Sequence, residues 1–178
     1  DLARGGGSGV TPEAAREAGY TVAGTREEMA AYAPDGEPRL CGQFGEGHMP
    51  YEFDSAISVD PPYDRLPHLS EMTARALELL ENPKGFFLMV EGGRIDHAGH
   101  GNKLAHNVLE TIEFARAVDV ALAWAEGRDD TLVLVTADHE CGGLRILEPS
   151  ARGEWPKVEW ASRGHTGVAV PVYATGPG

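Results

Sequence analysis

Two short apolar runs in this chain have the pattern of buried strands. The first covers residues 86–90, follows a Pro-Lys-Gly turn and ends in Glu91 and two glycines. The second covers residues 131–137 and ends directly in an Asp-His pair. Short apolar runs bounded by turn residues are typical of strands that are covered on both faces of a parallel sheet. A third run, residues 168–174, predicts a last strand.

Helical patterns lie between these strands. Leu, Met and Ala recur at helical spacing over residues 69–82, with charged residues between them, which predicts an amphipathic helix whose N-cap is Ser70. A longer stripe with the same period predicts a helix over residues 102–126. Capping and turn residues predict short helices over 13–18 and from Thr25, strands over 20–23 and 39–44, and an irregular loop over 45–67.

The order strand, helix, strand predicts an α/β fold. Such a crossover is right-handed and joins parallel neighbours in one sheet. The polar residues that end the strands at 86–90 and 131–137 then lie at the same edge of the sheet. Open α/β sheets place their functional sites at this edge, so we expect Asp96 to lie near Asp138.

Candidate metal ligands follow the first strand. Asp96 and His100 are four residues apart, and in a helix such residues share one face. A carboxylate and an imidazole on one face suit zinc. The alternative is that Asp96 caps a helix and that His100 is an ordinary surface residue.

Two further motifs add to this picture. Asp138 and His139 end the second strand, although Asp138 as an N-cap beside a polar His139 is the alternative. His165 lies between two glycines ahead of the last strand, and alone it is a weak signal. Two strands that both end in Asp and His make a coincidence less probable than either motif alone.

Charge and cysteine usage narrow the function classes. The 178 residues carry a net charge of −13, which argues against a nucleic-acid-binding surface because such surfaces need a basic face. The negative field also opposes an anionic phosphate, so bound divalent cations would have to reverse it locally.

No apolar run approaches the ~20 residues of a membrane-spanning helix. Cys41 and Cys141 have neither zinc-ribbon nor redox spacing, so we expect free buried thiols, with a disulfide left open.

These motifs, in this order, resemble the alkaline phosphatase family. The resemblance covers nearly the whole chain, and three ordered motifs are far more specific than any one of them. The principal matches are Val90-Glu91-Gly92-Gly93-Arg94-Ile95-Asp96-His97 with His100, then Val135-Thr136-Ala137-Asp138-His139, then Gly164-His165-Thr166-Gly167. Supporting matches are Gly5-Gly6-Gly7, Ala18-Gly19-Tyr20, Thr25-Arg26-Glu27-Glu28 and Gly47-His48-Met49-Pro50-Tyr51-Glu52.

The resemblance implies a three-layer α/β/α sandwich with a largely parallel central sheet, and a site with two zinc ions and one magnesium ion. The ligands that it implies are Asp96, His100 and His165 for the first zinc, Asp138 and His139 for the second, and Glu91 for magnesium. His97 follows a ligand directly, and two roles stay open for it: a water-mediated contact to phosphate, or a polar role behind the ligands.

The chain departs from the family in one important respect. The family's serine nucleophile, the Asp beside it and the phosphate-binding Arg belong to a region that precedes the matching part. Asp54-Ser55-Ala56 looks like the nucleophile motif, but it follows residues 48–51, which come after the nucleophile in the family. We therefore expect residues 1–178 to be a partial catalytic domain without the nucleophile region or the C-terminal end, with a short insert at about 140–163. Alone it is expected to be inactive.

The function implied is a metal-dependent phosphate monoester hydrolase with a broad substrate class. Alternatives are a phosphodiesterase or phosphomutase of the same superfamily, or a non-catalytic zinc-binding domain. The spelling Glu91-Gly92-Gly93-Arg94-Ile95-Asp96 favours the monoesterase. The resemblance also implies a periplasmic or secreted location and a homodimer, whereas the physiological substrate stays open.

Overall fold

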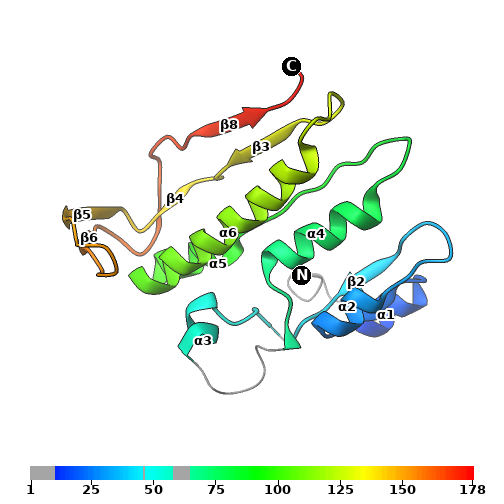
Figure 1. Ribbon diagram of the computed structural model, residues 1–178. Helices are drawn as coiled ribbons and strands as arrows, with labels where there is room; N and C mark the ends of the chain where they lie inside the picture. The colour runs from blue at the N-terminus through cyan, green and yellow to red at the C-terminus, as the bar shows by residue number, and fades with distance from the viewer. Residues whose placement is uncertain (1–10, 46, 58–64) are drawn as a thin grey trace. The chain divides into compact units, whose positions relative to one another are not determined.

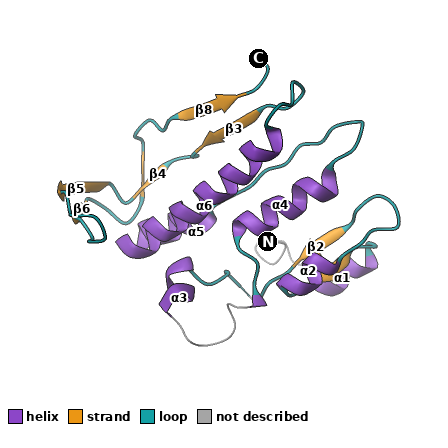
Figure 2. Ribbon diagram, viewed as in Figure 1, coloured by secondary structure: helices purple, strands orange, loops and turns teal. Residues whose placement is uncertain are grey.

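The computed structural model describes residues 11–45, 47–57 and 65–178, in a mixed α/β arrangement (Figures 1 and 2). The chain divides into two compact units. The N-terminal unit contains residues 1–50 and 54–89, and the C-terminal unit contains residues 51–53 and 90–178.

The N-terminal unit is built from short elements with capped helices. Thr11 accepts a hydrogen bond from the Ala14 N–H at 3.2 Å, and Thr25 accepts one from the Glu28 N–H at 3.1 Å, which confirms both predicted helix starts. Its elements are α1 (Pro12–Glu17), β1 (Thr21–Ala23), α2 (Arg26–Ala31), β2 (Leu40–Gly42) and α4 (Leu69–Leu80), with α3 (Glu52–Ile57) shared between the units.

Strands β1 and β2 are a parallel pair in which Val22 lies opposite Cys41. The buried side chains of this unit include those of Ala23, Met29, Cys41 and Leu77. Helix α4 begins at Leu69, where the sequence indicated, but its N-cap is His68 and not Ser70, and it ends at Leu80 and not at residue 82. The Glu71 carboxylate accepts the His68 N–H at 2.8 Å, which satisfies a donor that the helix leaves open.

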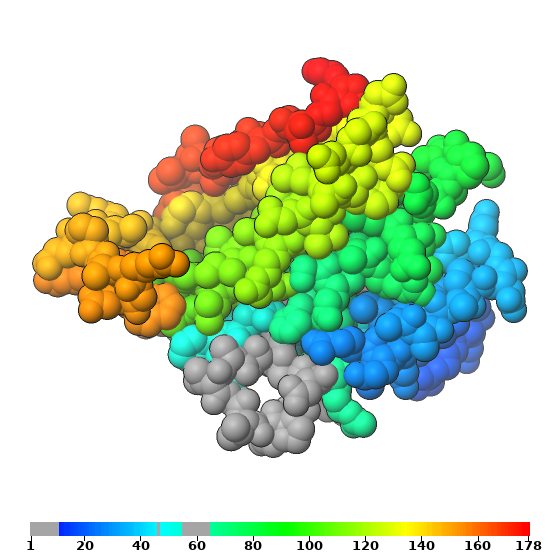
Figure 3. All heavy atoms as spheres, in the orientation of Figure 1, coloured from blue at the N-terminus to red at the C-terminus, as the bar shows by residue number. Residues whose placement is uncertain are grey.

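The C-terminal unit holds two adjacent helices and three antiparallel strand pairs. Its elements are α5 (Gly93–Gly101), α6 (Leu104–Ala125), β3 (Val133–Thr136), β4 (Glu140–Cys141), β5 (Leu144–Glu148), β6 (Lys157–Trp160), β7 (His165–Thr166) and β8 (Val172–Thr175). The pairs are β3 with β8, β4 with β7, and β5 with β6. Figure 1 shows α6 running beside β3, and Figure 3 shows the β5–β6 hairpin projecting at one end of this unit in orange.

Several predicted elements differ from the observed ones. Residues 86–90 pair with no described strand, and Phe87 and Met89 are 88% and 75% exposed, so this segment is not a buried strand. An unbroken apolar run does not show whether both faces of the segment are buried. In the structure every second side chain of residues 86–90 is exposed. Among the described strands only β1 and β2 are parallel, whereas the sequence predicted a largely parallel sheet.

Two further predictions need correction. The long helix expected over 102–126 begins at Leu104, because Asn102 adopts a left-handed conformation (φ 52°) that ends α5. The loop expected over 45–67 contains α3, and its residues 58–64 lie outside the described residues. None of the described helices is both long enough and apolar enough to cross a membrane.

Candidate metal centre

Helix α5 places Asp96 and His100 on one face. Gly92 is the N-cap of this helix, so Asp96 lies in its first turn and is not a capping residue. His100 lies one turn later, and its Nε2 atom is 3.4 Å from Oδ2 of Asp96. The i, i+4 spacing seen in the sequence therefore produces a real juxtaposition of a carboxylate and an imidazole.

His165 reaches the same point from β7. Its Nε2 atom is 3.2 Å from Oδ1 of Asp96 and 3.0 Å from Nε2 of His100. Zinc forms bonds of about 2.0–2.2 Å to such atoms, and tetrahedral geometry then separates neighbouring donors by roughly 3.3–3.6 Å. The three observed separations are close to this range, so the three donors fit one zinc ion.

Supporting contacts orient these donors. Nδ1 of His100 lies 2.5 Å from the Arg163 carbonyl oxygen, and a proton on Nδ1 leaves the lone pair of Nε2 facing Asp96. Histidine ligands of metals are usually held by a carbonyl in this way. Within the described part of the chain, the buried Oδ1 atom of Asp96 makes no hydrogen bond, although Nε2 of His165 lies 3.2 Å away. Such an atom is costly unless a cation or donor approaches it.

Asp138 and His139 lie beside this cluster. The His139 ring stacks on the His165 ring with centroids 3.5 Å apart, which brings the second motif against the first. Nε2 of His139 is 3.2 Å from Oδ2 of Asp138, and the Asp138 side chain is 87% exposed. In the described residues, Nδ1 of His139 is buried and has no hydrogen-bond partner. This pair offers a nitrogen and a carboxylate for a second ion next to the first.

Glu91 and His97 lie outside the cluster of three. Glu91 is exposed just before α5, with its carboxylate against Gly93. His97 contacts Arg94, whose NH1 atom is 3.3 Å from Nδ1 of the imidazole. The Arg94 guanidinium in turn stacks on the Tyr51 ring at 3.6 Å. His97 therefore lies on α5 next to a candidate ligand but makes this contact with a cation.

Cys141 is a candidate ligand that the sequence analysis missed. Its Sγ atom belongs to a group in which the ligand atoms of Asp96, His100 and His165 all lie within 4.8 Å of one another. The thiol donates a hydrogen bond to the Asp96 carbonyl oxygen at 3.6 Å. Burial, this hydrogen bond and nearby carboxylates raise the pKa of Cys141 to about 11. Both thiols are free as expected, although only Cys41 is fully buried.

A half-buried carboxyl on α6 has an unusual protonation equilibrium. Burial raises the pKa of Glu110 to about 7, and the negative charges of Glu52 and Glu113 add to the shift. The Glu52 N–H donates to Glu110 at 2.7 Å, and Arg94 acts in the same direction by favouring the charged form. Glu110 is thus a group that titrates near neutral pH in the unit that holds the candidate ligands.

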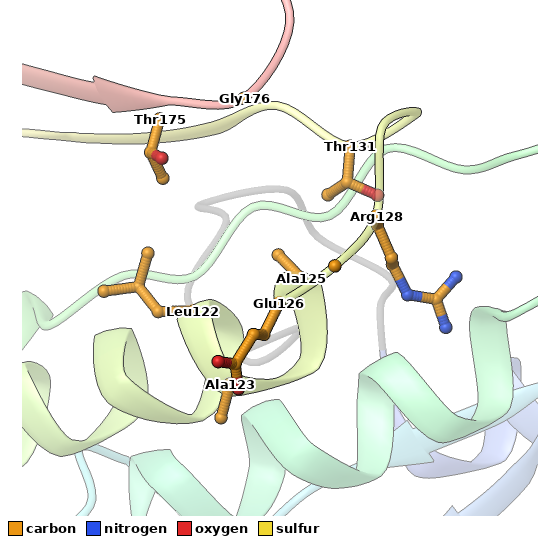
Figure 4. A pocket seen from close by; sticks show the side chains of 9 residues that line it. Leu122, Ala123, Ala125, Glu126, Arg128, Thr131, Thr175 and Gly176 are labelled. Carbon is orange, nitrogen blue, oxygen red and sulfur yellow. The ribbon is translucent and has the colours of Figure 1, made fainter.

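One hollow in the C-terminal unit lies away from the candidate ligands. It has a volume of about 490 Å³ and lies between the end of α6 and the end of β8 (Figure 4). Leu122, Arg128 and Thr175 are among its lining residues, and no candidate ligand lines it. The candidate functional site is therefore the cluster of Asp96, His100 and His165 and not this hollow.

Comparison with known families decides the classification. A family model described as alkaline phosphatase matches residues 2–155. The chain belongs to the alkaline phosphatase family. It is 43% identical over 159 residues to the tissue-nonspecific alkaline phosphatase of Felis catus, covering 86% of this chain and 28% of that protein. It is 32% identical over 204 aligned residues to alkaline phosphatase H of Pseudomonas aeruginosa, covering 96% of this chain and 43% of that protein.

Solved alkaline phosphatases have the same fold over most of this chain. A cold-active enzyme from a Shewanella species matches with a TM-score of 0.76 and 25% identity, over 93% of this chain and 56% of that one. A variant of the alkaline phosphatase from the Antarctic bacterium TAB5, with Mg bound in its M3 site, matches with a TM-score of 0.74 and 26% identity, over 93% and 48%. The chain thus spans roughly a quarter to a half of the lengths of the relatives that it matches.

Proposed function

We propose that this chain supplies the metal centre of an alkaline phosphatase that hydrolyses phosphate monoesters. The observation that supports the proposal best is the convergence of the Asp96 carboxylate with the Nε2 atoms of His100 and His165 at separations of 3.0–3.4 Å. A broad substrate range follows, because such a centre holds the phosphate group and not the alcohol that leaves.

The proposed metal set is two zinc ions and one magnesium ion. Zinc held by the candidate ligands would supply Lewis-acid stabilisation of the charge on the oxygens in a phosphoryl transfer. The proposed ligands are Asp96, His100 and His165 for the first zinc, Asp138 and His139 for the second, and Glu91 for magnesium. The donor types support this division, because imidazole suits zinc whereas a carboxylate alone suits the harder magnesium ion.

Other side chains of this unit position the donors. His100 directs Nε2 toward Asp96 through the contact of its Nδ1 atom with the Arg163 carbonyl. The His139 ring is held flat against the His165 ring, which limits the rotation of both. We assign His97 a role behind the ligands, through Arg94, since its imidazole lies 3.3 Å from that guanidinium.

We further propose that the nucleophile and the rest of a three-layer α/β/α sandwich, with a largely parallel central sheet, are supplied by residues outside these 178. The partial coverage of each relative supports this proposal. So do the exposed apolar side chains of Phe87, Met89 and Leu134, which a further strand or layer would cover. The chain alone is then expected to bind zinc without turning over substrate.

The test combines a zinc titration with a hydrolysis assay on the 178-residue chain. We expect two zinc ions to bind, and a chromogenic phosphate monoester at alkaline pH to be hydrolysed no faster than in buffer. Zinc binding that is unaffected by replacing Asp96 and His100 would refute the assigned centre. Turnover that a chelator abolishes would instead refute the proposal that the nucleophile lies outside the chain.

The substrate class has its own test, which does not need the nucleophile. The zinc-loaded chain should bind inorganic phosphate and a phosphate monoester more tightly than a diester with the same alcohol, as measured by calorimetry. A preference for the diester would favour a phosphodiesterase of the same superfamily.

A non-catalytic zinc-binding domain is the second candidate. The observation in its favour is the fourth donor, Sγ of Cys141, because structural zinc sites have four protein ligands whereas catalytic sites keep one position open. It predicts tight zinc binding and no phosphate binding by the loaded chain.

Location and assembly follow from the family assignment alone. We propose a periplasmic or secreted enzyme that forms a homodimer when complete. The support for the location is that relatives such as alkaline phosphatase H of Pseudomonas aeruginosa are bacterial alkaline phosphatases. Fractionation of cells that express the natural gene, followed by size determination of the purified protein, tests both proposals.

A further inference from the structure

The strand pair that carries His165 is very short. Strands β4 and β7 share two residue pairs, in which Glu140 lies opposite Thr166 and Cys141 lies opposite His165. A slip of one residue between paired strands turns every side chain of a strand to the other face, and so short a ladder offers little resistance to such a slip. The place of His165 in the metal centre therefore depends on what fixes this register.

The Glu140 carboxylate joins the two strands and the turn that follows β4. Its Oε2 atom accepts a hydrogen bond from the Thr166 hydroxyl at 2.5 Å, and its Oε1 atom accepts one from the Gly143 N–H at 2.7 Å. Hydrogen bonds to a charged acceptor are roughly twice as strong as those between neutral groups. One half-buried side chain thus fixes Glu140 against its cross-strand partner and also fixes the turn into β5.

Both ends of this cross-strand contact are sequence neighbours of candidate ligands. Glu140 follows His139, Thr166 follows His165, and the two imidazole rings stack with centroids 3.5 Å apart and planes 22° apart. The Glu140 carboxylate is not part of the ligand group that contains His165 in the described residues, and both of its oxygens already accept hydrogen bonds. Its route to the metal centre therefore runs through the backbone of β4 and β7.

We propose that Glu140 is a positioning residue of the metal centre, which holds the His139 and His165 imidazoles together by fixing the register of β4 and β7; this rests on the proposed function. The two imidazoles are proposed ligands of different zinc ions, so Glu140 would couple one ligand set to the other. Residues that orient metal ligands typically account for about 10–100-fold in metal affinity. The competing explanation is that the negative charge of Glu140 attracts cations without fixing any position.

The test compares three variants by zinc affinity and by NMR of the metal-free protein. Glu140→Ala removes both hydrogen bonds. Glu140→Gln removes the charge but can keep both, because its amide oxygen accepts the Gly143 N–H and its amide N–H donates to the Thr166 hydroxyl oxygen. Glu148→Gln is the matched control, since it removes a carboxylate of β5 whose cross-strand contact with Lys157 is exposed.

The two measurements should change together. In the metal-free unmodified chain, in E140Q and in E148Q, the ring protons of His139 and His165 should show a nuclear Overhauser effect, because the rings stack. E140A should lose this effect and bind zinc on the order of 10–100-fold more weakly in competition with a chelator, whereas E140Q and E148Q should stay within about threefold. If E140A does not fold, Thr166→Val should weaken both signals, because it removes one of the two hydrogen bonds, and Thr166→Ser should leave both unchanged.

The outcomes separate this inference from the proposed function. An E140A variant that keeps the Overhauser effect and the zinc affinity overturns the proposal. An E140Q variant that keeps the effect but binds zinc as weakly as E140A also overturns it, because the charge of Glu140 would then act and not its hydrogen bonds. An unmodified chain that binds no zinc refutes the proposed function, and the ring contact in metal-free E140A and E140Q still decides whether Glu140 holds the two imidazoles together.

Discussion

Replacing His100 by Ala should weaken zinc binding by about two orders of magnitude. The Nε2 atom of His100 lies 3.4 Å from Asp96 Oδ2 and 3.0 Å from His165 Nε2, so it is central to the three-donor cluster. Structural zinc binding is worth about 10–16 kcal/mol for four ligands, or roughly 3 kcal/mol for each ligand. A loss of about 3 kcal/mol corresponds to on the order of a 100-fold rise in the dissociation constant.

The measurement is a competition titration of zinc against a chromophoric chelator. The matched control is His106→Gln on α6, because His106 contacts the rings of Tyr51 and Phe53 and is not in the cluster. Circular dichroism without metal should show the same helix content for both variants. A zinc affinity of H100A within threefold of the unmodified chain would refute the assignment of His100, and an equal loss in H106Q would show that the effect is not specific to the site.

Three further predictions follow from particular contacts. Gly99→Ala should lower the free energy of unfolding by about 1–3 kcal/mol in urea, because the added methyl group meets Cys141 at 3.0–3.1 Å; Gly36→Ala, with open space at its Cβ position, is the control and should have little effect. The pKa of Glu110 is raised to about 7, so the stability that its neutral form provides is complete below about pH 4.5 and is lost as the pH rises through 7. Glu110→Gln should therefore be about 1–2 kcal/mol more stable than the unmodified chain at pH 8 and no more stable at pH 4, and equal differences at both pH values would contradict this. Thr25→Ala removes the acceptor of the Glu28 N–H and should cost about 1 kcal/mol in the same urea assay, whereas an unchanged midpoint would show that this cap contributes nothing.

Local sequence rules predicted the parts of this chain that local physics decides. The Thr11 and Thr25 caps were predictable because the capping hydroxyl and the N–H that it accepts are three residues apart. The juxtaposition of Asp96 and His100 was predictable for the same reason, since both belong to one helix. The N-cap of α4 was not predicted correctly, because both His68 and Ser70 lie at the start of the helix. The structure favours His68, whose backbone N–H donates a hydrogen bond to the Glu71 carboxylate.

Long-range strand pairing could not be predicted in the same way. Residues 86–90 have the composition of a buried strand, but composition does not name a partner, and the described chain provides none. The family resemblance predicts His165 as a ligand. The sequence spacing of Cys141 relates it only to Cys41, and this spacing fits no metal-binding or redox motif. The pairing of β4 with β7, in which Cys141 lies opposite His165, is what reveals the thiol as part of the cluster. A shift of one residue in this register would turn the thiol to the other face.

Metal binding should stabilise the folded state of the C-terminal unit. Asp96, His139 and His165 come from three different segments, and in the described residues Asp96 Oδ1 and His139 Nδ1 are buried without hydrogen-bond partners. Such atoms cost free energy in the metal-free protein, and a cation that binds the folded unit alone offsets this cost. The N-terminal unit, in contrast, satisfies its helix ends with Thr11, Thr25 and Glu71. We therefore expect zinc to stabilise the unit that carries the proposed chemistry, in addition to any part that it takes in the reaction.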